Sequence, residues 1–315
     1  MAQTDVPHRT RTIDGDRIFR LITVLAAASI VIILLGMLVT MVYESLPAIA
    51  VSGFSFLTST VWNPVSEEFG ALSYFYGSVV SSVLALALAA PLSIAVALFI
   101  TEICSRKTGG LISTLVELLA AIPSVIYGLW GVLVMAPWLQ RTVQPFLNDY
   151  LGFLPFFRGA SYGVSMLAAV FILMIMIVPI ITSITKELLL AVPDSQREAA
   201  VALGATRWEM IRLAVLPYAR SGILGAVILG LGRAVGETMA VTMVIGNTPQ
   251  ISLSLLAPGY TMPSVIANEF AEASSKVHGA ALMEIGLVLL VVTLIINVGA
   301  RMLVWSVTRQ SGGRG

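Results

Sequence analysis

Charged residues are scarce in this sequence of 315 residues. Lys, Arg, Asp and Glu together make up 11% of it, less than half of the roughly 25% that is usual in globular proteins. Hydrophobic residues make up 57%, and the mean hydropathy is +0.94. This composition excludes an ordinary soluble domain and predicts an integral membrane protein.

Several kinds of site are missing from the sequence as well. The single cysteine, Cys104, excludes an intrachain disulfide, and the two histidines, His8 and His278, form no metal-ligand cluster with it. No G-x-x-x-x-G-K-[ST] phosphate loop occurs, so the chain is not expected to hydrolyse a nucleotide itself. No basic patch with interleaved aromatic residues occurs either, which argues against nucleic-acid binding. We therefore expect neither an enzyme, nor a metal centre, nor a cofactor held by this chain.

Six apolar segments are each long enough to cross a bilayer, which requires about 20 residues. The first has 23 uncharged residues, whereas the apolar part of a signal peptide has about 7–15, so we interpret it as an uncleaved transmembrane helix. The predicted fold class is therefore all-α, a polytopic membrane protein. The predicted spans are residues 21–43, 74–101, 112–138, 163–186, 218–246 and 281–305.

Basic residues are distributed unevenly among the segments that connect these spans. The N-terminal segment and the connection 187–220 are rich in arginine, whereas the loop 44–73 has no basic residue and the loop 247–280 has one. Since Lys and Arg accumulate on the cytoplasmic side of a membrane, we predict that both termini are cytoplasmic. The predicted domains are a cytoplasmic segment 1–20, a transmembrane domain 21–305 and a cytoplasmic tail 306–315.

Two of the three predicted outer loops, 44–73 and 247–280, contain aromatic residues among Pro, Ser and Gly. Individually they are expected to be anchors at the membrane interface. Together they could instead form a docking platform for an external partner. They are Phe54, Phe56, Trp62, Phe69, Tyr260 and Phe270.

The fifth predicted span contains two opposite charges. Arg233 and Glu237 lie in a stretch from Ser221 to Asn268 in which Tyr260 is the only other ionisable residue. A charge at membrane depth costs roughly 2.5–3.5 kcal/mol on insertion scales, so it is normally paired and functional. Residues four apart share a helix face, which predicts an ion pair. We interpret Arg233 as a residue of a substrate pathway, because its planar guanidinium suits a tetrahedral oxyanion; the alternative is a purely structural pair.

Two further residues belong to the candidate pathway. Thr238 directly follows Glu237. Ser124 follows Pro123 in the third span, and this proline either breaks the helix and exposes backbone amides to an anion or only kinks it. The candidate pathway set is therefore Arg233, Glu237, Ser124 and Thr238.

The remaining polar and small residues of the spans receive structural interpretations. Glu117 and Glu284 fall near span ends, so they are expected to be hydrated or interfacial carboxylates, although either could pair with a basic group of a partner. Gly230, Gly232 and Gly236 are expected to permit close helix contacts rather than to bind a ligand.

The connection between the fourth and fifth spans carries the most specific pattern. Ser195 with Glu198, and Thr206 with Glu209, each match a capping box, in which a hydroxyl and a carboxylate three residues later begin a helix. Gly204 lies between the two boxes, where a left-handed residue would end the first helix. The connection therefore predicts a short helix, a glycine turn and a second short helix.

The end and the surface of this helix pair can also be predicted. Leu216-Pro217 should close the second helix, because proline within a helix loses a hydrogen bond. Ala199 and Ala200 are small and would let another protein surface approach closely. The alternative is an amphipathic helix pair that lies on the membrane surface.

These residues resemble a known motif. The EAA motif of the membrane subunits of binding-protein-dependent ABC importers has the form E-A-A, three residues, G, nine residues and I-x-L-P. The sequence matches it with Glu198-Ala199-Ala200, Gly204 and Ala214-Val215-Leu216-Pro217, departing only at Ala214, where the family usually has isoleucine. The runs 119–128 and 230–240 resemble the phosphate-transporting branch of this family, and the likeness covers about residues 15 to 305.

The resemblance implies a type I ABC importer permease (MetI-like) fold in a bacterial inner membrane, where the chain would form half of a phosphate pathway. The loop 190–217 would be the coupling helix that docks on an ATPase. Its expected coupling residues are Glu198, Ala199, Ala200, Gly204, Leu216 and Pro217. The implied partners are a homologous second permease (PstA-like), two copies of an ABC ATPase (PstB-like) that bind ATP and Mg²⁺, and an extracytoplasmic phosphate-binding protein (PstS-like).

Two alternatives remain open. The substrate could be another oxyanion such as sulfate or molybdate, because one arginine does not distinguish tetrahedral anions. The chain could also be a secondary transporter in which Arg233 and Glu237 form a proton relay. The capped EAA loop argues against the second alternative, because a carrier that works alone needs no coupling helix.

Overall fold

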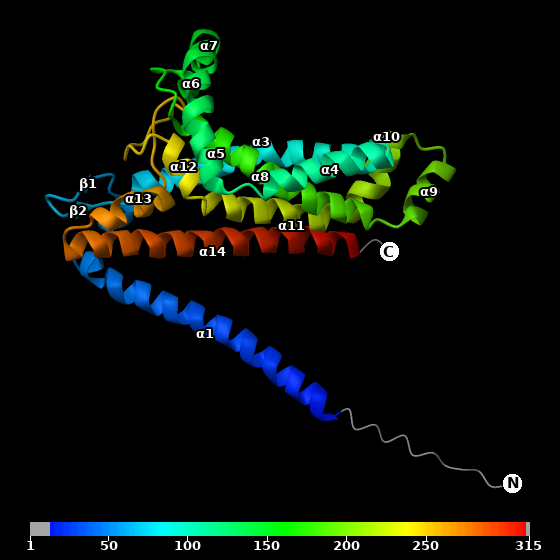
Figure 1. The fold of residues 1–315 in the computed structure, drawn as a ribbon, viewed down its shortest axis with the longest axis horizontal. Coiled ribbons are helices and arrows are strands. Elements are labelled where there is room, and N and C mark those ends of the chain that lie inside the picture. The colour runs from blue at the N-terminus through cyan, green and yellow to red at the C-terminus, as the bar shows by residue number, and fades with distance from the viewer. Residues whose placement is uncertain (1–12, 313–315) are drawn as a thin grey trace, which may run out of the picture.

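A computed structural model describes residues 13–312 of the chain, which are helical almost throughout (Figure 1). The long helices are α1 (Ile13–Ser52), α3 (Leu72–Leu98), α4 (Arg106–Ala120), α8 (Met166–Leu190), α11 (Leu216–Val235) and α14 (Lys276–Gly312). The short helices are α2 (Ser55–Thr58), α5 (Ser124–Trp130), α6 (Ala136–Trp138), α7 (Gln144–Leu151), α9 (Asp194–Ala202), α10 (Arg207–Met210), α12 (Met239–Val244) and α13 (Met262–Glu269).

Turns of other geometry join several of these helices. The π-helical turns are η1 (Phe99–Ile103), η2 (Gly131–Met135), η3 (Leu139–Val143) and η5 (Ile211–Val215). The 3-10 turns are η4 (Pro155–Phe157) and η6 (Phe270–Glu272). The strands β1 (Trp62–Asn63) and β2 (Glu68–Phe69) pair antiparallel with Trp62 opposite Phe69. We call the end of the molecule that carries this pair the hairpin end, and the end that carries α9 and α10 the coupling-loop end.

The number of spans agrees with the prediction. Within residues 13–312, five helices are long and apolar enough to cross a membrane, and a sixth span results if α4 and the helical segment Ser124–Leu151, which begins with α5, are counted as one bent span. The all-α class is confirmed, with the short β1–β2 hairpin as an addition. Arg9 and Arg11, which contribute to the predicted orientation, lie outside the described residues.

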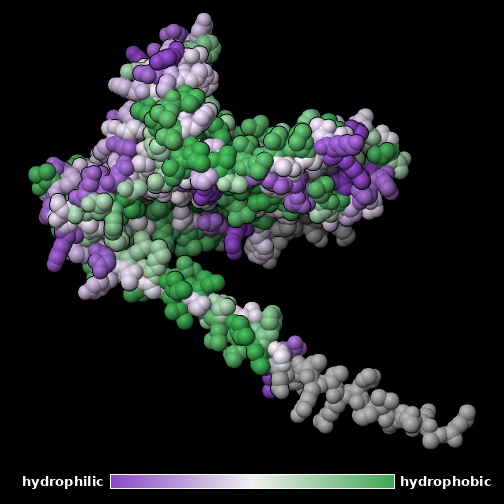
Figure 2. All heavy atoms as spheres, viewed as in Figure 1, coloured by the Kyte–Doolittle hydropathy of each residue, from purple (hydrophilic) through white to green (hydrophobic). Residues whose placement is uncertain are grey.

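Helix α1 is longer than predicted. It begins at Ile13 and continues through Pro47 to Ser52, so the predicted start of a loop at residue 44 was wrong. Ala48 in the added turns is fully buried in an apolar cluster at the hairpin end, and such packing stabilises helical turns more than intrinsic propensity does. Away from this end α1 diverges from α14, and its most apolar window is uncovered and hydrophobic on its surface (Figures 1 and 2).

Helix α8 forms the centre of the core. In its most apolar window 61% of the residues are buried, more than in any other candidate span of the described chain. It packs between α3, α4 and α11, with Ile172, Ile177 and Ile181 fully buried. Buried hydroxyls add interhelical hydrogen bonds: the Ser93 hydroxyl of α3 donates to Val178 O of α8 at 3.2 Å.

Two predicted spans are interrupted. The third is broken between α4 and α5, where the chain bends by 90° and the following helices project as an arm from the body (Figure 1). Proline at 123 explains this break, because its ring and its missing N–H disfavour a continuing helix. The fifth span ends at Val235 rather than at residue 246, and the chain resumes as the short helix α12.

The aromatic residues of the outer loops do not form one exposed platform. Phe56, Phe69 and Tyr260 are buried in the cluster at the hairpin end, and Trp62 packs edge-on against Phe69 with ring centroids 4.8 Å apart. Phe54 and Phe270 are exposed. Most of the predicted anchors are therefore core residues of a small folded cap that joins the ends of α1, α3 and α14.

Candidate functional site

The ion pair predicted in the fifth span is present. Nη2 of Arg233 lies 3.2 Å from Oε2 of Glu237. Arg233 is in the last turn of α11, and Glu237 follows the end of that helix at Gly236. The pair therefore lies at the point where the span is interrupted, which the sequence pattern did not indicate.

The two partners of this pair have different surroundings. The Glu237 side chain is 3% exposed, whereas the Arg233 side chain is 49% exposed. The N–H of Ala240, in the first turn of α12, donates to Oε1 of Glu237 at 3.3 Å. The carboxylate is thus fixed by burial and by the next helix, while much of the guanidinium remains accessible.

The glycines around the pair differ in their contacts. A Cβ on Gly230 would come within 2.6 Å of the Ile181 side chain on α8, so Gly230 permits the predicted close helix contact. A Cβ on Gly232 would meet no atom within 4 Å, and one on Gly236 would meet only the Gly232 carbonyl oxygen, at 3.5 Å, among the described residues. For these two positions the predicted close contact between helices is therefore absent within residues 13–312, and they leave space beside Arg233.

The two interrupted spans meet each other. Helix α5, which follows the 90° break, packs on α12, which follows the break beside Glu237. A Cβ on Gly128 of α5 would lie 3.0 Å from Cα of Ala240 and 2.6 Å from Sδ of Met243. Discontinuous helices that meet in this way are the usual framework of substrate sites in transporters.

Ser124 and Thr238 occupy these two breaks. Ser124 is the first residue of α5 and is half-buried. Thr238 precedes α12, and its hydroxyl donates to Gly236 O at 3.3 Å. No hydrogen bond joins either side chain to the Arg233–Glu237 pair within residues 13–312, so the structure brings their helices together without direct contact between the side chains.

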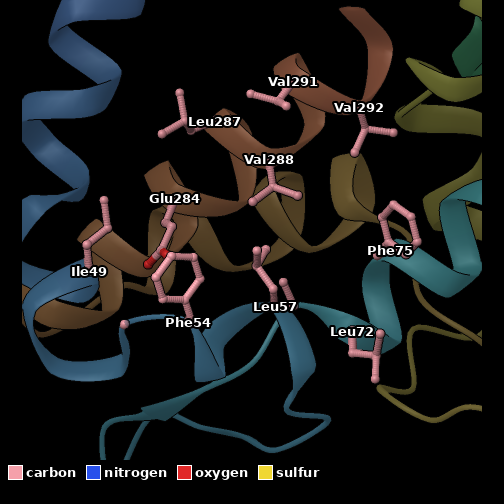
Figure 3. Close-up of a pocket in the computed structure, with 12 residues that line it drawn as sticks. Ile49, Phe54, Leu57, Leu72, Phe75, Glu284, Leu287, Val288, Val291 and Val292 are labelled. Atoms are coloured by element: carbon pink, nitrogen blue, oxygen red, sulfur yellow. The ribbon is translucent and has the colours of Figure 1, made fainter. Parts of the chain in front are cut away.

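The other two carboxylates of the spans lie in contrasting places. Glu117 is exposed, and its Oε1 lies 3.0 Å from Nζ of Lys186 on α8; the basic partner is thus in the same chain. Glu284 is 7% exposed, so the expectation of a hydrated carboxylate was wrong for it. It lies beside Phe54 and lines an apolar pocket of about 550 Å³ between the ends of α1, α3 and α14 (Figure 3).

The coupling-loop end begins with the predicted helix, turn and helix. Helix α9 ends before Gly204, which has φ +83°. The N–H of Ala205 donates to Ala200 O at 3.1 Å and the N–H of Gly204 to Val201 O at 2.9 Å. This pair of bonds is a Schellman motif, and it confirms the predicted glycine turn.

The two predicted capping boxes have opposite outcomes. Thr206 and Glu209 form a complete box that begins α10. Ser195 and Glu198 do not form one, because α9 begins at Asp194 with Pro193 before it, and Ser195 lies inside the first turn. The rigid backbone of Pro193, which takes the N-cap position, sets the start of the helix two residues earlier than the hydroxyl pattern indicates.

The prediction that Leu216-Pro217 closes the second helix was wrong. Instead α10 continues through the π-helical turn η5 into α11, so that residues 207–235 form one span. The wider turn accommodates the proline ring and its missing N–H, because Pro217 stands at the start of the next α-helical segment. The coupling loop is therefore joined rigidly to the helix that carries Arg233.

A groove of about 640 Å³ lies between α9 and the η5–α11 segment. Ala199, Ala200, Gly204 and Pro217 line it together. Glu198 is exposed on α9 outside the lining, and Leu216 packs inward against the apolar cluster at this end. The loop presents exposed apolar side chains around the groove. They are Leu203, which is 90% exposed, Leu213 (69%) and Trp208 (63%).

Comparison with known proteins identifies the family. Residues 89–309 match the model described as "binding-protein-dependent transport system inner membrane component". The chain belongs to this family. As such an inner membrane component, it is a multi-pass membrane protein and a non-enzymatic transport subunit, and it works with other subunits and a binding protein.

Curated relatives extend over nearly the whole chain. The "phosphate transport system permease protein PstC" of Mesorhizobium japonicum is 46% identical over 301 residues, which cover 94% of this chain and 92% of the relative. The protein of the same description from Xylella fastidiosa is 42% identical and covers 99% of this chain and 100% of the relative. That of Haemophilus influenzae is 41% identical, with coverage of 94% and 95%.

Solved structures confirm the MetI-like permease fold. A chain of a bacterial alginate ABC transporter, in complex with an alginate-bound periplasmic protein, matches with a TM-score of 0.60 at 18% identity and covers 92% of this chain and 96% of that chain. A chain of the inward-facing MetNI methionine ABC transporter matches with a TM-score of 0.51 at 18% identity, with coverage of 81% and 97%.

Proposed function

We propose that this chain is the permease subunit of an ATP-driven phosphate importer and forms half of its translocation pathway. Relatives that are 41–46% identical over more than nine-tenths of the chain are described as phosphate transport system permeases. The observation that carries the proposal is the half-exposed guanidinium of Arg233, held at a break in a span by a buried carboxylate.

Phosphate passage needs attraction that is strong enough to admit the anion and weak enough to release it. The Arg233 guanidinium supplies N–H donors in a planar fork that matches oxyanion geometry. Glu237 lies 3.2 Å away and partly neutralises the cation, so an anion competes with a fixed carboxylate for the same donors. Thr238 and Ser124, at the two meeting breaks, are the neighbouring hydroxyls of the proposed pathway.

The groove at the coupling-loop end is the proposed ATPase contact. The exposed apolar residues around the groove suit burial against a partner surface, and the small side chains that line it would let that surface approach closely. The proposed partners are two copies of an ABC ATPase (PstB-like), which would bind ATP and Mg²⁺, a second permease (PstA-like) and an extracytoplasmic phosphate-binding protein (PstS-like). The coupling-loop end and both termini would then face the cytoplasm.

Radiolabelled phosphate uptake in cells that carry Arg233→Gln tests the pathway. Glutamine keeps hydrogen-bonding capacity and removes the charge, so we expect uptake to be abolished while the assembled complex is retained on purification. Sulfate uptake serves as the control for cell integrity. Normal phosphate uptake by the assembled variant would remove Arg233 from the pathway, and sulfate uptake that depended on this chain would favour another oxyanion.

A further inference from the structure

Arg197 makes four polar contacts at the coupling-loop end, to Val192, Asp194, Glu102 and Leu189. It lies in α9, one residue before the Glu198-Ala199-Ala200 run. Its Nη1 donates to Val192 O at 2.5 Å, and its Nη2 donates to Leu189 O at 2.8 Å. These carbonyls belong to the last turn of α8 and to the residue that connects it to α9. A cation at this position also complements the negative end of the helix dipole of α8.

The same guanidinium reaches a second span. Nη2 of Arg197 lies 3.0 Å from Oε1 of Glu102, which is in η1 at the end of α3. The Glu102 side chain is 7% exposed and that of Arg197 is 19% exposed. A carboxylate this deeply buried depends on its partner, because removal of one member of a buried pair leaves an uncompensated charge.

Asp194 also contacts Arg197, but it does not substitute for Glu102 or for the two carbonyl groups. It lies 3.4 Å from Nη1 of Arg197, but its side chain is 89% exposed, and exposed pairs of this kind contribute little. The contacts that fix Arg197 are therefore those to α8 and to Glu102. They tie one residue of α9 to the ends of two separate spans, which are 95 and 8 residues away in sequence.

The packing below this polar set continues the connection. A buried apolar cluster joins Ala97 of α3, Leu189 of α8 and Val215 of η5, and Ala200 of α9 packs against it. Closely packed interiors have low compressibility and transmit strain. The spans that meet in this cluster must therefore move together or repack. Beside this apolar packing, the Arg197–Glu102 ion pair adds a charged link between α9 and the end of α3.

We propose that Arg197 is a positioning residue that transmits displacement of α9 to α3 and α8 through its Glu102 pair and its two carbonyl contacts. The proposal rests on the proposed function, since the displacement would be supplied by the ATPase. Without the link, α9 would still bind the ATPase through its exposed face, but its movement would reach α3 less fully. The loss would then appear as ATP hydrolysis that no longer drives transport.

The test uses the complete importer in proteoliposomes, with the binding protein present, and measures phosphate accumulated per ATP hydrolysed. Glu102→Gln and Arg197→Gln should each lower this ratio by about two- to thirtyfold, the range typical of residues along a coupling network, while the ATPase stays bound. The double variant should be no worse than the worse single variant, since both substitutions remove the same link.

Glu117→Gln is the matched control. It makes the same change in a carboxylate that is also 3.0 Å from a cation at this end of the molecule, but is 57% exposed. It should leave the ratio unchanged. Unchanged ratios for the Glu102 and Arg197 variants, additive losses in the double variant, or an equal loss for Glu117→Gln would overturn the proposal.

A cross-linking variant separates transmission from folding. With Cys104→Ser as background, Glu102→Cys and Arg197→Cys can be joined by a short bifunctional methanethiosulfonate, because both positions line a pocket of about 610 Å³ that admits the reagent. The link should restore the ratio and its reduction should lower it again. A link that restores nothing, or failure of every variant including Arg197→Lys to assemble, would show a role in structure alone. Failure of the wild-type vesicles to accumulate phosphate would count instead against the proposed function.

Discussion

Replacement of Gly204 by valine should weaken the attachment of the ATPase without disturbing the packing of the spans. Gly204 has φ +83°, and a Cβ there would meet no atom within 4 Å in the described chain. Valine at this position would therefore cost free energy through the left-handed backbone conformation, and not through a steric clash. A left-handed L-residue costs roughly 1–2 kcal/mol, and a β-branched one lies at the upper end or beyond.

One or two kcal/mol corresponds to a factor of about 5–30 in the population of the turn. The Schellman bonds of Ala205 and Gly204 hold the groove residues of α9 and α11 in register, so the apparent Kd for the ATPase should rise by about that factor. The assay is titration of the purified ATPase against the detergent-solubilised permease complex, with phosphate uptake measured in parallel.

Gly204→Asn and Gly204→Ala are the comparison variants. Asparagine tolerates the left-handed region better than other non-glycine residues, so its effect should be the smallest, with alanine between asparagine and valine. If asparagine weakened binding as much as valine, side-chain size in the groove would be responsible rather than the backbone. Unchanged ATPase affinity and uptake for Gly204→Val would refute both the turn requirement and the coupling assignment.

Two further substitutions test the ion pair and the remaining cap. Glu237→Gln removes the carboxylate that competes for the Arg233 guanidinium, so phosphate should be bound more tightly and released more slowly. The expected result is a lower maximal rate of uptake at saturating phosphate. An unchanged rate would mean that the pair has a structural role only. Thr206→Ala should destabilise the start of α10 by about 0.5–2 kcal/mol, measured as a lower unfolding temperature or as weaker ATPase binding. Ser195→Ala should have no such effect, because Ser195 caps no helix. Equal effects of the two substitutions would contradict the observed caps.

Local patterns were the ones that the sequence predicted best. Arg233 and Glu237 are only four residues apart, so the predicted contact survives although the helix ends between them. Gly204 needs only the conformational preference of glycine. The number of spans follows from apolar length alone. The MetI-like fold came from the resemblance, and similar solved structures confirm it.

Features that depend on distant neighbours were missed. The contact of α5 with α12 joins residues more than 100 positions apart, and no periodicity reports it. Local chemistry predicted that Pro217 ends a helix, whereas the π-helical turn η5 before it lets the helix continue into α11. The Arg197–Glu102 pair was missed because a carboxylate at the end of a long apolar run needs a cation nearby, and the sequence offers Arg106 four residues later, whereas the observed partner is 95 residues away.

The unequal burial of Arg233 and Glu237 has a mechanical consequence. One partner is clamped between two helices, and the other is a long, flexible side chain with open space at its flank. In the proposed pathway the guanidinium would swing towards a passing oxyanion while its counter-charge stays in place, and the same carboxylate would draw it back once the anion has left. Each passage would end with the side chain in its starting position, ready for the next.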